Sequence, residues 1–190
     1  MRLLVLAAAL LSSILLQGCL PLAATGIASG ALMFDDRRTS GIYVEDENIE
    51  WKARARLREH FKDVHLDVTS YNLTVLLTGE VPTEEMKNQA TEIVRAVPSV
   101  KNVANEVMVA GNASIASHGN DALITSSVKA RFLGNRTFSP NHVKVVTEAG
   151  VVYLLGLVSQ AEGEAAAEVA RNTSGVSRVV KVFEYIQPRA

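Results

Sequence analysis

The sequence predicts an α+β protein made of two tandem α-β-β-α-β domains, each a three-stranded mixed sheet packed against two helices. Two observations predict this fold. Residues 46–112 and 121–187 align with each other at spacings of 75 to 77 residues, and both copies show helical and strand periodicity in the same order. The length of 190 residues accommodates one ordinary domain or two small ones and excludes a large multidomain enzyme.

The internal repeat is clearest in one apolar strand, where residues 75–81 align with residues 152–158 at a spacing of 77. Val, Leu, Gly and Val coincide within this strand. Residues on either side of it align at nearly the same spacing, so the copies differ only by short insertions or deletions. The aligned pairs are Asp46 and Asp121, Ile49 and Ile124, Ala53 and Val128, Leu57 and Phe132, Val68 and Val145, Val100 and Val176, Val103 and Val179, and Val107 and Phe183.

Each copy is predicted to begin with a helix that carries one apolar stripe. Apolar residues recur there at every fourth position, which places them on one face of a helix. Two strands joined by a hairpin turn follow, at about residues 66–79 and 143–156, because apolar segments flank short turn sequences. The stripe residues are Ile49, Ala53, Leu57 and Phe61 in the first copy, and Ile124, Val128 and Phe132 in the second.

A second helix and a last strand complete each copy. Thr83 is the expected N-cap of this helix in the first copy, and Ser159 with Glu162 forms a capping box in the second. The last strand, at residues 103–109 or 179–186, is expected to return beside the second strand. The buried residues of the second helix are expected to be Met86, Ala90, Ile93 and Val97 in the first copy, and Gly163, Ala166, Ala167 and Ala170 in the second.

Three glycines are expected to have structural roles. Gly79 and Gly156 occupy equivalent positions in the two central strands, which indicates a bulge or a close approach of another backbone. Gly175 fits the left-handed residue that ends a helix, and Ser99 stands in its place in the first copy.

The N-terminal residues are interpreted as a lipoprotein signal. Arg2 precedes an uncharged run over residues 3–16, which is shorter than the ~20 residues of a spanning helix. The run leads into Leu-Gln-Gly-Cys, which resembles the bacterial lipobox and predicts acylation of Cys19, the only cysteine. The predicted organisation is a signal peptide at residues 1–18, a lipidated cysteine and tether at 19–45, the first domain at 46–112, a linker at 113–120 and the second domain at 121–187.

A transmembrane anchor is the alternative, since no charged residue occurs from residue 3 to residue 34. Pro21, Gly26 and Gly30 interrupt this stretch and argue against one continuous helix. Leu20 follows the cysteine in place of an aspartate, which by resemblance to Gram-negative lipoprotein sorting indicates the outer membrane, facing the periplasm.

Composition and side-chain patterns argue against several functions. A net charge of −1, from 19 basic and 20 acidic residues, does not predict nucleic-acid binding, and one cysteine excludes a cysteine-based zinc site. The four histidines have no metal-ligand spacing, and Ser159 lacks a histidine partner. Glu84 and Glu85 are explained by the start of a helix. We therefore expect no enzyme and no metal or other cofactor.

The strand motif V-x-L-x-G-x-V at residues 152–158, an alanine-rich helix and G-V-x-x-V at residues 175–179 resemble the BON domain. The first copy has diverged further, with Ser99 in place of the glycine. Two such domains after a lipobox and a tether resemble the dual BON-domain outer-membrane lipoproteins of Gram-negative bacteria (the DolP/YraP-like family). The similarity covers essentially the whole chain.

The resemblance implies a periplasm-facing protein that binds anionic phospholipid through the second BON domain, supports outer-membrane integrity and is often enriched at the division site. The family's lipid contact maps onto the first helix of the second copy, where members often carry an aromatic residue in place of Leu123. Charge agrees with this choice, because residues 46–112 carry eight basic against eleven acidic residues and residues 120–190 carry eight against six. The candidate phospholipid-binding residues are Leu123, Ser127, Lys129, Ala130, Arg131, Leu133 and Gly134.

Two alternatives stay open at this point. Leu123 and Leu133 can pack against the other domain, with the nearby cations merely solvated. The protein can also be an interaction adaptor that docks envelope or division proteins, with incidental lipid contact.

Overall fold

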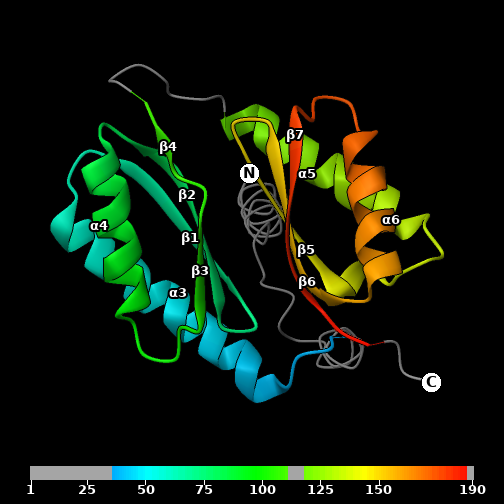
Figure 1. The fold of residues 1–190 in the computed structure, drawn as a ribbon. Helices are drawn as coiled ribbons and strands as arrows, with labels where there is room; N and C mark the ends of the chain where they lie inside the picture. Colours follow the sequence, from blue (N-terminus) through cyan, green and yellow to red (C-terminus); the bar gives the residue numbers. More distant parts are fainter. Residues whose placement is uncertain (1–35, 111–117, 188–190) are drawn as a thin grey trace, which may run out of the picture. The chain divides into compact units, whose positions relative to one another are not determined.

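The computed structural model describes residues 36–110 and 118–187 and contains the α-β-β-α-β unit twice (Figure 1). The predicted α+β fold of two tandem domains is confirmed. The first domain contains α3 (Ser40–His60), β1 (His65–Tyr71), β2 (Thr74–Val81), α4 (Glu84–Arg95), β3 (Asn102–Asn105) and β4 (Met108–Val109). The second contains α5 (His118–Leu133), the 3-10 helix η2 (Pro140–His142), β5 (Val143–Glu148), β6 (Val151–Val158), α6 (Gln160–Arg171) and β7 (Arg178–Tyr185).

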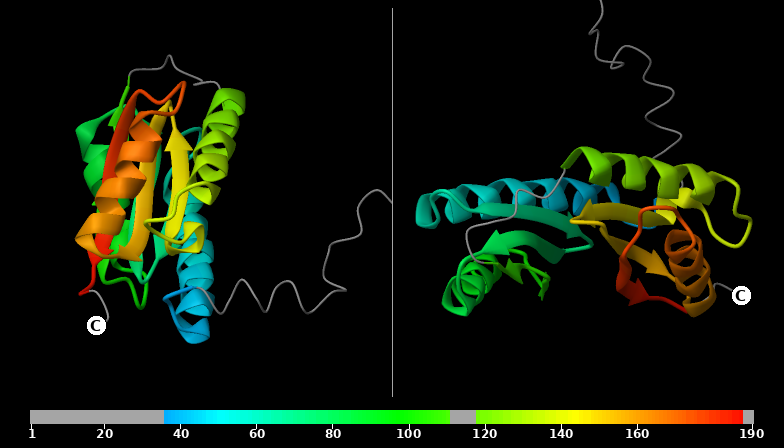
Figure 2. Two further views of the ribbon diagram at one scale, coloured as in Figure 1. Left: turned by 90° about the vertical axis from the view of Figure 1, so that its right-hand side faces the viewer. Right: turned by 90° about the horizontal axis from the view of Figure 1, so that it is seen from above.

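Each sheet is mixed and has its second strand in the centre. In the first domain β1 pairs antiparallel with β2, and β3 and β4 pair parallel with β2. In the second domain β5 pairs antiparallel with β6, and β7 pairs parallel with β6 along its whole length. Both helices of a domain pack on the same face of its sheet, as the residues of each core show (Figure 2).

The helical stripes expected from the sequence form the two cores. All seven predicted residues of the first helices, from Ile49 to Phe61 and from Ile124 to Phe132, are buried. In α6 the four predicted residues are buried as well. In α4 the buried set also includes Val94, which the sequence analysis omitted, while Met86 and Ile93 are only partly buried. Packing of these stripes on the strands therefore positions all four helices.

The opposite faces of the two sheets form a third apolar cluster that joins the domains. Tyr71 and Leu76 of the first domain pack there with Tyr153, Leu155 and Leu157 of the second. Successive side chains of a strand point to opposite faces, so a central strand between helices and another sheet is apolar on both sides. Every residue of β6 is accordingly buried. The run of apolar residues in β6 is therefore explained by two contacts, one with the helices of its own domain and one with the first domain.

The first helix begins at Ser40, six residues earlier than the sequence analysis placed the start of the domain. Thr39 caps it, because its hydroxyl accepts a hydrogen bond from Ile42 N at 3.3 Å. Arg38 precedes the cap and is held by Asp36 and Asp46, at 2.7 and 2.9 Å. These tertiary contacts order the end of the expected tether, and apolar periodicity alone does not reveal them.

The last strand of the first domain is split, which gives its sheet a fourth short strand in place of the expected three. Asn105 ends β3, and its side-chain amide donates to Lys87 O at 3.0 Å and to Thr91 Oγ1 at 2.5 Å. Its side-chain oxygen accepts from Val107 N at 3.0 Å, and Val107 turns into the core. The strand is interrupted because these bonds tie Asn105 to α4.

Within residues 36–110 and 118–187, none of the helices is long and apolar enough to cross a membrane. Cys19, the signal peptide and most of the tether lie outside the described residues, as does most of the linker. The alternative of a transmembrane anchor at residues 3–34 also concerns residues outside that range.

Candidate functional site

The candidate site is the outer face of α5, whose inner face is fixed at three levels of the core by Ile124, Val128 and Phe132. The start of the helix is fastened by Asp121, whose carboxylate accepts hydrogen bonds from Ala149 N at 2.9 Å and Gly150 N at 2.8 Å. The helix therefore cannot rotate about its axis without breaking these contacts. Its outward residues stay outward.

Two leucines dominate this outward face. Leu123 is 67% exposed and Leu133 is 76% exposed, so neither leucine packs against the first domain. They are ten residues apart, which corresponds to about 15 Å along a helix. The other five predicted residues, Ser127, Lys129, Ala130, Arg131 and Gly134, are also exposed. The structure thus brings the seven candidates together along one exposed helix and its end.

The serine hydroxyls of this face are satisfied within the helix. Ser126 Oγ donates to Ala122 O at 2.7 Å, and Ser127 Oγ donates to Leu123 O at 2.8 Å. Burying an unpaired hydroxyl costs free energy, whereas a hydroxyl bonded to its own helix leaves water at lower cost. The face is therefore more compatible with an apolar environment than its sequence indicates.

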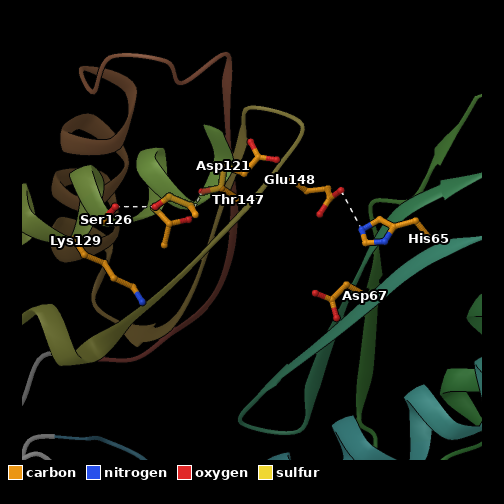
Figure 3. A pocket seen from close by; sticks show the side chains of 9 residues that line it. His65, Asp67, Asp121, Ser126, Lys129, Thr147 and Glu148 are labelled. Atoms are coloured by element: carbon orange, nitrogen blue, oxygen red, sulfur yellow. Dashed lines mark hydrogen bonds and ion pairs between the residues drawn. The ribbon is translucent and has the colours of Figure 1, made fainter. Parts of the chain in front are cut away.

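The two candidate cations of α5 differ in their surroundings. The Arg131 guanidinium donates to the carbonyl oxygen of Asn172 and lies 3.5 Å from Thr173 Oγ1, at the C-terminal end of α6. Cations stabilise helix C-termini, so Arg131 has a structural role. Lys129 instead lines a hollow of about 410 Å³ (Figure 3).

This hollow is mainly acidic. Asp67 of β1 and Asp121 and Glu148 of the second domain line it, together with His65, whose Nε2 lies 3.4 Å from Glu148 Oε1. Carboxylates near Lys129 weaken its attraction for a second anion. Within the described ranges, no group of three or more histidine, cysteine, aspartate or glutamate side chains is arranged to hold a metal ion.

Residues 45–111 and 120–187 each match the BON domain family. The chain belongs to this family. Across 92% of both chains it is 36% identical to the outer membrane lipoprotein DolP of Haemophilus influenzae. It is also 34% identical to a 21 kDa hemolysin of Actinobacillus pleuropneumoniae, over 80% of each chain, and 29% identical to the osmotically-inducible protein Y of Escherichia coli, over 82% of this chain and 80% of that one.

These relationships confirm the predicted membership of the dual BON-domain, DolP-like family and the expected placement among outer-membrane lipoproteins. None of the three relatives is named as an enzyme, and the absence of enzymatic activity in this chain stays a prediction. The lipid-binding residues likewise stay a prediction.

The BON glycines lie where the backbone requires them. Gly79 has φ +114°, and a Cβ built on it would lie 2.1 Å from the carbonyl oxygen of His65. A Cβ on Gly156 would lie 2.3 Å from the carbonyl oxygen of His142. Gly175 has φ +88° and Ser99 has φ +69° at the equivalent place, so the left-handed conformation is as expected. The position relative to the helix was predicted wrongly, because α6 ends at Arg171 and Gly175 lies in the turn before β7. A side chain at Gly175 would press on Ile124, one of the three buried stripe residues of α5.

Asp46 and Asp121 align in the internal repeat, and no role was predicted for either residue from the sequence. Each carboxylate holds the hairpin turn of its own BON domain, and Asp46 accepts from Asn72 N at 2.9 Å and Leu73 N at 2.8 Å. Both central residues of both turns have positive φ, as in a type I′ turn. Conservation of one acidic residue between two copies with different turn sequences was the signal that pointed to this role.

A pair of arginines, also without an assigned role, ties the two BON domains together. Arg37 forms two hydrogen bonds of 2.8 Å with Glu162 and one of 2.7 Å with Leu157 O, all in the second domain. Hydrogen bonding by Arg37 lowers the pKa of Glu162 from 4.5 to about 2. Arg38 lies 4.0 Å from the ring centroid of Tyr71 in the first domain. Burial alone would lower the pKa of Arg38, but hydrogen bonds to Asp36 and Asp46 raise it.

Further polar contacts connect the edge of β1 with the edge of β5. Lys144 Nζ lies 3.1 Å from Glu50 Oε1 of α3 and 3.4 Å from Ser70 O, and His65 meets Glu148 at the other end. Both strands therefore run alongside each other. The helices that cover them, α3 and α5, belong to one compact unit.

Proposed function

We propose that this protein is a lipid-anchored, periplasm-facing outer-membrane protein that binds anionic phospholipid through α5 of its second BON domain and supports outer-membrane integrity. The observation that carries the proposal is the exposure of Leu123 and Leu133 on a helix held rigidly by its other face. Acylation of Cys19, which the lipobox predicts, supplies the anchor. The relative named as an outer membrane lipoprotein supports this assignment.

The expected interaction is shallow and mainly apolar. Full burial of one leucine contributes about 1.5 to 3 kcal/mol, and two leucines about 15 Å apart allow α5 to lie flat on the surface. A basic residue near an anionic bilayer contributes about 1 kcal/mol. Arg131 is bound to α6 and Lys129 faces carboxylates, so the charges contribute less than their number indicates.

A weak contact is sufficient when the protein is already anchored. Acyl chains at Cys19 keep α5 near the bilayer, which converts its binding into an intramolecular step at high effective concentration. The contact with α5 then orients the BON domains and adds little to overall retention. This division of roles explains why only two large apolar residues are needed.

Sedimentation with vesicles tests the proposal. The chain from residue 19 carrying Cys19→Ser is mixed with phosphatidylcholine vesicles with and without phosphatidylglycerol. We expect Leu123→Asp to abolish binding at any salt concentration, because it replaces apolar burial by a charge that the bilayer repels. Lys129→Ala combined with Arg131→Ala should weaken binding mainly at low salt, where charges are least screened.

A matched control introduces the same charge elsewhere in the second BON domain. Ala161→Asp places a carboxylate at an exposed position in the first turn of α6, where it suits the helix dipole. This variant should bind vesicles like the parent. If Leu123→Asp folds and still binds like the parent, α5 is not the lipid contact, and the adaptor function with an apolar docking face becomes the better description.

A further inference from the structure

The first BON domain exposes the only tryptophan of the chain. Trp51 lies on α3 and is 72% exposed, and Val44 on the same helix is 57% exposed. The two residues are seven positions apart, so they lie on one stripe about 10 Å long. No ligand was predicted for this domain from the sequence, and Trp51 is not among the candidate residues.

The stripe cannot turn into the protein. Ile49, Ala53 and Leu57 occupy the opposite side of α3 and are buried. Glu50 holds α3 in place from the side, because its carboxylate accepts a hydrogen bond from Ser70 N at 2.8 Å and forms an ion pair with Lys144 at 3.1 Å. An exposed indole makes no contribution to this packing. Its surface is available to a partner outside the described chain.

Charge around Trp51 is opposite in sign to that of the domain as a whole. The part of α3 that begins at Trp51 carries four cations, Lys52, Arg54, Arg56 and Arg58, against the single carboxylate Glu59. Arg54 pairs with Glu50 and Asp67, and Arg56 donates to Ala96 O at 2.7 Å. Lys52 follows Trp51 directly, and Arg58 lies seven residues further along its stripe. The exposed carboxylate of Glu47 lies one turn before Trp51 on the same face, so the indole is flanked by two cations and one carboxylate, and the cations are in excess.

The position of α3 along the chain adds an argument about the partner. Sixteen residues separate Cys19 from Asp36, where the described structure begins, and such a segment spans at most about 60 Å. The helix that follows is the first element after the predicted lipid anchor. A bilayer is thus within reach of Trp51 whenever Cys19 is acylated.

We propose that α3 is a second bilayer contact, in which the Trp51 indole sits at the headgroup boundary while Lys52 and Arg58 meet the phosphates of anionic phospholipid. Tryptophan suits this boundary because its ring is largely apolar and its N–H is polar. The inference rests on the lipid anchor of the proposed function but not on lipid binding by α5. The first BON domain thereby gains a membrane-binding role that its negative net charge does not indicate.

Fluorescence of the acylated protein, which begins at Cys19, tests this inference directly in vesicles, because Trp51 is the only tryptophan. The vesicles contain phosphatidylcholine and phosphatidylglycerol, with or without bromine on the acyl chains. We expect Trp51 of the acylated protein in vesicles to emit at a shorter wavelength than Trp51 of the unacylated chain in detergent-free buffer. We also expect the brominated lipid to quench this emission. If the emission of Trp51 in vesicles is the same as in buffer and is not quenched by the brominated lipid, the inference is wrong.

Two tryptophan transfers separate this inference from the proposed function. Trp51→Phe with Leu123→Trp reports on α5, and Trp51→Phe with Glu92→Trp reports on an exposed site of α4, which should not be quenched. Quenching in the Leu123→Trp protein without quenching of Trp51 refutes the contact by α3 and leaves the proposed function intact. Quenching of Trp51 alone supports the contact by α3 and refutes binding through α5.

Binding by the unacylated chain gives a second measurement. Trp51→Ala should lower vesicle affinity about tenfold, as partial burial of a large aromatic side chain predicts, without changing the unfolding midpoint. Val109→Ala, which removes an exposed apolar side chain from β4 of the same domain, should have no effect. Equal affinity of the Trp51→Ala and parent proteins would contradict the inference.

Discussion

The two BON domains agree in their inward residues and differ in their outward ones. The helices α3 and α5 share a buried stripe and an aspartate that holds the hairpin turn. Outside, α3 presents Trp51 among cations, whereas α5 presents two leucines among small residues. Packing constrains every inward position because voids and overpacking both cost stability, and the outward positions are free to diverge with function.

The domains also differ in their last strands. In the second domain β7 pairs with eight consecutive residues of β6, whereas in the first domain Asn105 turns to α4 and splits the strand. The intact and the interrupted strand occupy the same place in the same fold. The fold therefore tolerates a local break in an edge strand, but it retains the central strand and its glycine in both copies.

The largest expected effect concerns the paired glycines. Gly79→Ala should destabilise the protein by about 4 kcal/mol or more, because its Cβ would meet a backbone oxygen and its φ is positive. Gly156→Ala meets a similar backbone contact without positive φ, so we expect it to cost about 1 to 2 kcal/mol less. Urea denaturation of both variants measures the difference. Equal stabilities would show that the two central strands respond to a side chain in the same way.

The paired aspartates are expected to give the next largest effect. Asp46→Ala should cost about 3 kcal/mol, because it removes the partner of buried Arg38 as well as two bonds to the turn. Asp121→Ala removes only the bonds to the turn and should cost about 1.5 kcal/mol. Thermal unfolding distinguishes these values. A larger loss for Asp121→Ala would contradict the role assigned to Arg38.

The smallest effect concerns a capping box that only the second domain has. Glu162 bonds to Ser159 and Arg37, whereas Met86 occupies its place in α4. Since the folded pKa of Glu162 is lowered to about 2, its contribution is fully present above pH 4.5 and is lost as pH falls toward 2. We expect a contribution of about 1 kcal/mol, reduced by the proximity of solvent.

Denaturation of the parent and Glu162→Gln at about pH 6 and about pH 2.5 measures this contribution. The difference in unfolding free energy between the two proteins should shrink at the lower pH. Arg37→Ala, which keeps the capping box, should remove most of the same pH dependence because the guanidinium is the main cause of the lowered pKa. A difference that is constant with pH would refute the assignment.

Much of the fold follows from the sequence because it rests on local periodicity repeated twice. The buried stripes of α3, α5 and α6, the hairpins and the left-handed conformation of Gly175 and Ser99 each have a local signature. The exposed helix face with Leu123 and Leu133 was also predictable, since residues excluded from the stripe of a rigid helix must lie outside it. Exposure of these leucines, as opposed to packing on the other domain, required the structure.

The sequence by itself determined the two copies, their order of elements and most of the core residues, because hydrophobic periodicity depends on positions only a few residues apart; the buried face of α4, with Val94, was predicted only in part. The tertiary structure decided what joins the copies: the apolar cluster around Tyr71 and Tyr153, and the contacts of Arg37 with Glu162 across 125 positions. It also decided which cations stay available to a membrane. Such contacts depend on which surfaces meet in space, and no local pattern in the chain specifies that.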